Sequence, residues 1–179
     1  KDAGFKKLIV TAKHHDGFCI WDSEHTEYDV AASGYKDANG QSDILAEISK
    51  ACTDQNMDMG LYLSPWDIHD ESYGYYDENH KPTDKKHDHL DYNEYYDNQL
   101  KEILGNEKYG NKGYFVEVWM DGAKGNGANA QEYDFKRWFN TIQENEGIKA
   151  GYDADCMLFG AEAYTTVRWI GNELGIAGK

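Results

Sequence analysis

The sequence predicts an α/β protein with a parallel sheet, because strand-like and helix-like segments alternate along its 179 residues. Strands that are joined through helices pair in parallel by right-handed crossovers. Either an open doubly wound sheet or a segment of a (β/α) barrel fits this pattern. No glycine-rich phosphate loop follows a strand, which argues against a nucleotide-binding doubly wound sheet. A closed barrel of this type has about eight strands, so a barrel would be present only in part.

The strand-like runs are short and rich in apolar or β-branched residues. They are KKLIVTA at 6–12, MDMGLYLS at 57–64, GYFVEVWMDG at 113–122 and DCMLFG at 155–160. Pro65 stops the second run. Polar and aromatic residues follow every run, and ligands of both architectures bind beyond the carboxyl ends of the strands. The functional residues are therefore expected at this edge of the sheet.

Three segments between these runs show the periodicity of amphipathic helices. They cover 42–56, 92–106 and 131–145. Ser42 or Asp43 is the expected N-cap of the first helix.

Composition limits the function classes that fit this chain. A hydrophobic content of 40% indicates a folded core, and the length fits a single domain. The net charge of −15 argues against nucleic acid and anionic membrane surfaces as partners. No apolar run reaches the roughly 18 residues of a membrane span. Cys19, Cys52 and Cys156 are widely spaced and predict free thiols rather than a disulfide framework.

The third strand carries a candidate catalytic carboxylate. Side chains alternate along a strand, so Glu117, Trp119 and Asp121 share one face. Asp121 would lie at the strand end, before Gly122, where a carboxylate can serve as nucleophile or base. Alternatively, this aspartate only caps a turn. Glu117 lies about 13 Å from Asp121 along an extended strand and cannot be its catalytic partner.

Two adjacent histidines, His14 and His15, follow the first strand and have three interpretations. They could bind a metal, support the structure, or form hydrogen bonds to a polar substrate. Adjacent residues of a strand point to opposite faces, and no HExxH pattern is present, so no metal site is predicted. Trp66, Trp119 and Trp169 offer flat apolar faces for sugar rings or for the core. A mouth rich in carboxylates, histidine and tryptophan suits carbohydrate hydrolysis.

Four motifs in order resemble the retaining α-L-fucosidases of glycoside hydrolase family 29. They are VTAKHHDGFCIWDSEHTEYDV, GLYLSPWD, FVEVWMDGAKG and RWIGNELG. The resemblance implies a (β/α)8-like TIM barrel, a fucosylated oligosaccharide or glycoprotein as substrate, and no cofactor or metal. The RWIGNE element is similar to the branch that prefers α-1,3/1,4-linked fucose.

The resemblance also implies the roles of individual residues. Asp121 would be the nucleophile, and Glu173 the acid/base, with Glu162 as a local competitor. His14, His15 and Tyr62 would contact the hydroxyl groups of fucose.

```
```

The resemblance further implies that residues 1–179 are part of a single catalytic barrel domain. About four β-α units are expected, incomplete at the N-terminus and at the C-terminus, and the fragment alone is expected to be inactive. The compartment stays open, with a secreted or periplasmic location favoured. Two rival functions remain at this point: a non-catalytic fucose-binding relative, and a metal-dependent barrel hydrolase that uses His14 or His15.

Overall fold

The strands form one parallel sheet whose order follows the chain. The computed structural model describes residues 2–74, 77, 79, 81, 90–124, 131–147, 156–160 and 165–170. The sheet consists of β1 (Lys7–Lys13), β2 (Asp58–Leu63), β3 (Glu117–Trp119), β4 (Met157–Gly160) and β5 (Val167–Arg168). Each strand pairs with the next one in sequence, in the order β1-β2-β3-β4-β5. The parallel sheet is as predicted, and its order does not reverse as that of a doubly wound sheet does.

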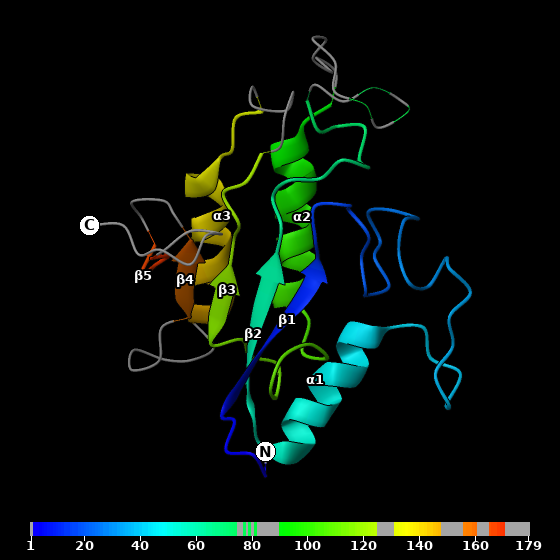
Figure 1. Ribbon diagram of the computed structural model, residues 1–179, viewed down its shortest axis with the longest axis vertical. Coiled ribbons are helices and arrows are strands. Elements are labelled where there is room, and N and C mark those ends of the chain that lie inside the picture. Colours follow the sequence, from blue (N-terminus) through cyan, green and yellow to red (C-terminus); the bar gives the residue numbers. More distant parts are fainter. Residues whose placement is uncertain are drawn as a thin grey trace.

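Three α-helices connect the first four strands. They are α1 (Ile44–Gln55), α2 (Tyr92–Leu104) and α3 (Phe135–Ile142), and a π-helical turn, Gln143–Gly147, continues α3. Figure 1 shows α2 and α3 behind the sheet, and none of the described helices crosses in front of it. Among the residues that the structure describes, helices thus cover one face of the sheet and not the other.

Aspartate caps explain where two of the helices begin. The side chain of Asp43 accepts a hydrogen bond from the amide of Ala46 at the start of α1. Asp91 accepts from the amides of Asn93 and Glu94 at the start of α2. Each carboxylate satisfies amides that have no partner within the helix and lies at the positive end of the helix dipole. Of the two predicted caps of α1, Ser42 and Asp43, the structure has Asp43.

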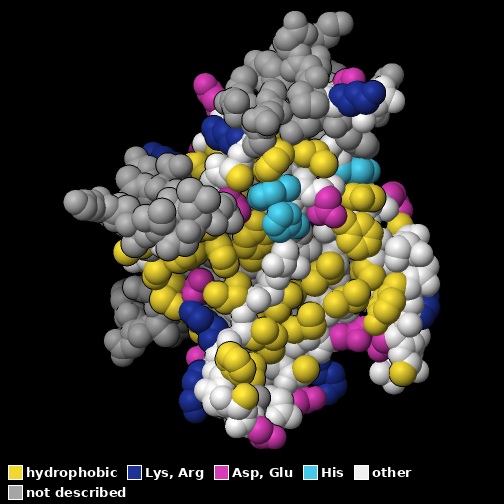
Figure 2. Space-filling view, viewed as in Figure 1, with side chains coloured by type: hydrophobic (Ala, Val, Ile, Leu, Met, Phe, Trp, Pro, Cys, Tyr) yellow, Lys and Arg dark blue, Asp and Glu magenta, His cyan; other side chains and the backbone are white. Residues whose placement is uncertain are grey.

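The core fills the space between the sheet and the helices behind it. Leu61 of β2 and Val118 of β3 are fully buried, as are Leu100 of α2 and Trp138 of α3. The opposite face of the sheet is turned toward the viewer in Figure 2, where hydrophobic side chains extend across it. Hydrophobic side chains thus lie on a face of the sheet that no described helix covers.

A bulge near the end of β1 changes the direction of its last side chains. Thr11 pairs with Tyr62, whereas Lys13 pairs with Leu63, so the register shifts by one residue between them. Thr11 is exposed, but Ala12 and Lys13 are both buried. A bulge places two residues opposite one and re-aims the side chains that follow. Strict alternation would have placed Lys13 on the same face as Thr11.

Two sequence predictions differ from the structure in length or number. The run at 113–122 contains only a three-residue strand, Glu117–Trp119, and β5 was not predicted.

The three cysteines are free, as expected, and all three are buried. None of the helices in the described part of the chain is long and apolar enough to cross a bilayer.

Candidate active site

Asp121 lies just beyond the carboxyl end of β3 and is held by two hydrogen bonds. Tyr62 of β2 donates its hydroxyl to Oδ2 of Asp121 at 3.0 Å. The amide of Ala123 donates to Oδ1 at 2.9 Å, which fixes the carboxylate against its own loop. The side chain of Asp121 is 16% exposed. An oriented, partly buried carboxylate at this edge of the sheet can act as a nucleophile or a base.

His15 lies beside Asp121 and is oriented by Ser64. Its Nε2 atom is 3.9 Å from Oδ2 of Asp121, and its Nδ1 atom is 2.7 Å from the hydroxyl of Ser64. The ring of Trp66 lies against the imidazole with 4.4 Å between ring centroids. Sequence reasoning placed Ser64 at the end of the second strand but gave it no role.

The two adjacent histidines lie on the same side, which corrects the expectation of opposite faces. β1 ends at Lys13, so His14 and His15 follow the strand instead of belonging to it. Their ring centroids are 4.0 Å apart, and His14 stacks on Tyr62 at 5.7 Å. Figure 2 shows histidine side chains gathered on the face that the sheet turns toward the viewer. The structure therefore brings His14, His15, Tyr62 and Asp121 together.

Burial shapes the ionisation of two groups at this site. Burial, and next the neighbouring His14, lower the pKa of His15 below its ordinary value, although Asp121 opposes this shift. Burial, and next the charge of Asp121, raise the pKa of Tyr62. The imidazole therefore favours its neutral form and the phenol stays protonated, which lets Tyr62 donate to the carboxylate.

A buried ammonium group supports the loop that carries the histidines. Nζ of Lys13 donates to Asp67 at 3.0 Å and to Gln99 at 2.8 Å. It also lies 5.3–5.7 Å from the ring centroids of three tyrosines of α2, Tyr92, Tyr95 and Tyr96. Sequence reasoning missed this arrangement, because a lysine at the end of a strand is usually solvated.

The loops after β1 and β2 are in direct contact around Asp67. Gly17 adopts a φ of +81°, and a Cβ atom built on it would lie 2.3 Å from Oδ1 of Asp67. The same oxygen accepts hydrogen bonds from the amides of His69 and Asp70. Asp67 therefore shapes its own loop with one oxygen and holds Lys13 with the other.

The remaining predicted residues lie beside this cluster, at a distance from it, or outside the described residues. Glu117 forms an ion pair with Lys7 near the opposite end of the sheet. Trp119 and Trp169 meet edge to face, 5.2 Å between centroids, beside Tyr62. Glu162 and Glu173 lie outside the residues that the structure describes.

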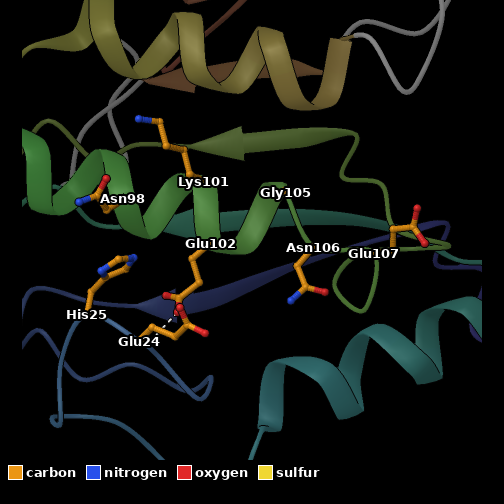
Figure 3. A pocket seen from close by; sticks show the side chains of 8 residues that line it. All are labelled: Glu24, His25, Asn98, Lys101, Glu102, Gly105, Asn106 and Glu107. Carbon is orange, nitrogen blue, oxygen red and sulfur yellow. Dashed lines mark hydrogen bonds between the residues drawn. The ribbon is translucent and has the colours of Figure 1, made fainter.

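A polar groove of about 620 Å³ on α2 is a separate feature. Figure 3 shows Glu102 at its floor, linked to the backbone of Glu24. Glu102 also accepts hydrogen bonds from the indole of Trp21 and the hydroxyl of Ser23. The carboxylate thus anchors the 21–24 segment and serves the structure of the loop after β1. The groove is lined by Glu24, His25, Asn98, Lys101, Glu102, Gly105, Asn106 and Glu107.

Metal ligands are not assembled in the part of the chain that the structure describes. Within residues 2–74 and the other described ranges, no group of three or more His, Cys, Asp or Glu side chains could hold a metal ion. The cluster described above consists of one carboxylate, two imidazoles and one phenol.

Comparison with known proteins matches this chain to one family. The sequence model described as alpha-L-fucosidase matches residues 1–165. Alpha-L-fucosidase 1 of Arabidopsis thaliana is 42% identical over 179 residues, which are 100% of this chain and 30% of that protein. A Ruminococcus gnavus glycoside hydrolase family 29 fucosidase, solved in complex with fucose, is 84% identical with a TM-score of 0.87. That match covers 99% of this chain and 35% of the fucosidase chain.

A more distant structure shows the same likeness. A glycoside hydrolase 29 family member from an unknown rumen bacterium is 31% identical with a TM-score of 0.70, over 97% of this chain and 28% of that one. The chain thus spans 28–35% of the length of these three relatives.

Proposed function

This chain belongs to the alpha-L-fucosidase family, and we propose that it carries the nucleophile side of a retaining α-L-fucosidase site. The reaction is the release of terminal α-L-fucose from fucosylated oligosaccharides or glycoproteins. The cluster of Asp121, Tyr62 and His15 supports this proposal, because it presents an oriented carboxylate next to groups that bind hydroxyls.

The proposed mechanism is a double displacement. Asp121 attacks the anomeric carbon as the bond to the leaving oxygen breaks, through an oxocarbenium-like transition state, and forms a fucosyl-enzyme. Tyr62 donates to Oδ2 of Asp121, which leaves the other lone pairs of the carboxylate for attack. A second carboxylic acid protonates the leaving oxygen and then, as a base, takes a proton from the water that releases fucose with retained configuration.

We assign that acid/base role to Glu173, with Glu162 as the competing candidate. Retention requires the two carboxyl groups to lie roughly 5–5.5 Å apart. The RWIGNE element that contains Glu173 is also the basis for proposing a preference for α-1,3/1,4-linked fucose. Replacing the acid with alanine should abolish release from an oligosaccharide but spare the first step with fucosyl fluoride, in which the fucosyl-enzyme forms and fluoride is released, since fluoride leaves without protonation. The two variants to compare are Glu173→Ala and Glu162→Ala. The one that no longer cleaves the oligosaccharide but still reacts with fucosyl fluoride identifies the acid.

The fold proposal is that residues 1–179 form part of one (β/α)8-like barrel. The sequential strand order supports it, as does the apolar face of the sheet that no described helix covers, since a barrel turns such a face toward its interior. A crystal structure of the full-length gene product tests it. A strand paired to the free edge of β1 within a closed barrel is the expected result.

The experiment that tests the function is covalent labelling. The full-length gene product is incubated with 2-deoxy-2-fluoro-α-L-fucosyl fluoride and its intact mass is measured, with Asp121→Ala as the control. One added fluorofucosyl group mapped to Asp121 and absent in the control is expected. A folded protein that binds fucose yet takes no label would indicate a fucose-binding relative instead. Labelling and turnover that require a divalent metal, and are lost on exhaustive chelation, would indicate a metal-dependent hydrolase.

A further inference from the structure

The hydroxyl of Ser64 makes three hydrogen-bond contacts of 2.7–3.1 Å, and their chemistry determines where its single proton points. Ser64 is fully buried just beyond the end of β2. Its Oγ atom accepts from the amide of Trp66 at 3.1 Å and donates to the carbonyl of Trp66 at 2.9 Å. A carbonyl oxygen only accepts, and two oxygens at 2.9 Å without a proton between them would repel. The hydroxyl proton is therefore directed at Trp66.

The third partner of this hydroxyl, His15, must then be a donor. Nδ1 of His15 lies 2.7 Å from Oγ, which has a lone pair left for it but no proton. A neutral imidazole has one N–H group, so a proton on Nδ1 leaves Nε2 bare. Burial keeps the imidazole in its neutral form by lowering the pKa of His15.

The bare nitrogen faces a second acceptor across a gap. Nε2 of His15 is 3.9 Å from Oδ2 of Asp121, too far for a hydrogen bond. That oxygen already accepts from Tyr62, and Oδ1 accepts from the amide of Ala123. Two acceptors that face each other in this way can both be satisfied by a ligand that donates hydrogen bonds. Both side chains are partly exposed: that of His15 is 20% exposed and that of Asp121 is 16% exposed.

We propose that Ser64 is a positioning residue that holds neutral His15 in its Nδ1–H tautomer, so that Nε2 accepts a hydrogen bond from a ring hydroxyl of bound L-fucose. The contact rests on the proposed function. It gives the site a specificity that the carboxylate alone does not supply, because a fluorine or an ether oxygen at the same ring position cannot donate.

The tautomer itself is tested by nitrogen NMR of the full-length gene product labelled with [15N]histidine. The His15 signals are assigned by their loss in His15→Gln. A protonated, pyrrole-type Nδ1 and a bare, pyridine-type Nε2 are expected in the wild type, and Ser64→Ala should shift the proton toward Nε2. A protonated Nε2 in the wild type would overturn the proposal. This readout does not depend on catalysis.

The hydroxyl contact is tested by inhibition with L-fucose and its 2-, 3- and 4-deoxyfluoro analogues. At one ring position the fluorinated analogue should bind about tenfold more weakly than fucose, the cost of one lost hydrogen bond. In Ser64→Ala this penalty should be severalfold smaller, because the proton of His15 can then lie on Nε2 and face the fluorine. An unchanged penalty in that variant would overturn the proposal.

Ser49→Ala is the matched control for the loss of a buried serine. Ser49 lies on α1, donates to the carbonyl of Leu45 and accepts from the amide of Gly110. Ser49→Ala should lower the free energy of unfolding. The fluorinated analogue should still bind more weakly than fucose by the same factor as in the wild type. If the Nδ1–H tautomer is present but fucose does not bind at all, the proposed function fails, and the hydroxyl contact fails with it.

Discussion

The ammonium group of Lys13 lies 3.0 Å from the carboxylate of Asp67, and the two side chains are 0% and 1% exposed. Removing one member of such a pair leaves an uncompensated charge in the core. Lys13→Met should therefore lower the free energy of unfolding by about 3–5 kcal/mol. Urea unfolding of the full-length gene product, followed by circular dichroism, measures this loss.

Two further variants separate the effect of burial from that of lost charge. Lys50→Met removes a lysine whose pair with Asp54 is exposed, and it should cost less than about 1 kcal/mol. The double variant Lys13→Met/Asp67→Leu removes both buried charges and should recover part of the loss. Equal costs for Lys13→Met and Lys50→Met would contradict the role of the buried pair.

Tyr62→Phe tests the hydrogen bond to the proposed nucleophile. The substitution keeps the ring that stacks on His14 but removes the donor to Asp121. A hydrogen bond to a charged group contributes about 1.5–3 kcal/mol, so kcat/KM for a fucoside should fall by roughly 10- to 100-fold. Steady-state kinetics measure the effect, with unfolding curves as the check on stability. Unchanged kinetics would show that Asp121 does not depend on Tyr62.

His15 should titrate below the ordinary histidine value of 6.5, because burial and His14 both disfavour its charge. As the pH falls, the unfolded chain binds this proton before the native protein does. The contribution of His15 to stability is therefore complete above the ordinary value and declines as the pH falls through it toward the lower native pKa. An NMR titration of the imidazole protons measures the midpoint.

Variants of the neighbouring residues should move that midpoint in opposite directions. His14→Gln removes a group that lowers the pKa of His15, so the midpoint should rise. Asp121→Asn removes a charge that raises it, so the midpoint should fall further. A midpoint that responds to neither change would contradict the charge coupling at the site.

Asp97 links α2 to α3 and should make stability sensitive to acid. Burial alone would raise its pKa, but hydrogen bonds from Lys101, Thr141 and Arg137 outweigh burial and lower it. Because the pKa of Asp97 is lower in the native protein than in the unfolded chain, its carboxylate contributes stability at pH values above the unfolded pKa. This contribution is lost as the pH falls through the native pKa. Asp97→Asn should therefore flatten the decline of unfolding free energy in acid, measured by urea unfolding at several pH values. An equally steep decline in the variant would contradict this.

The sequence predicted the helices better than the strands because helix ends carry local signals. Asp43 caps α1 where the pattern placed it, since capping involves residues only three apart. The strand at 113–122 is shorter than predicted and β5 was missed, because strand length depends on pairing with distant residues. The parallel order followed from the alternation of elements alone.

The residues around the site were predictable from the motifs, but their arrangement was not. Asp121, Tyr62, His14 and His15 lie together in the structure, whereas the histidines were expected on opposite faces. Strict alternation does not apply to them, because β1 ends at Lys13 and both histidines follow the strand. The apolar run before them does not show at which residue the strand ends.

Gly17 has a consequence for how this region can change during evolution. A side chain there would displace Asp67, and a displaced Asp67 would leave the charge of Lys13 unpaired. The fitness effect of a substitution at any one of these positions therefore depends on the residues at the other two. Positions 13, 17 and 67 form an epistatic unit, and a viable path to a larger residue at 17 must first replace the ion pair.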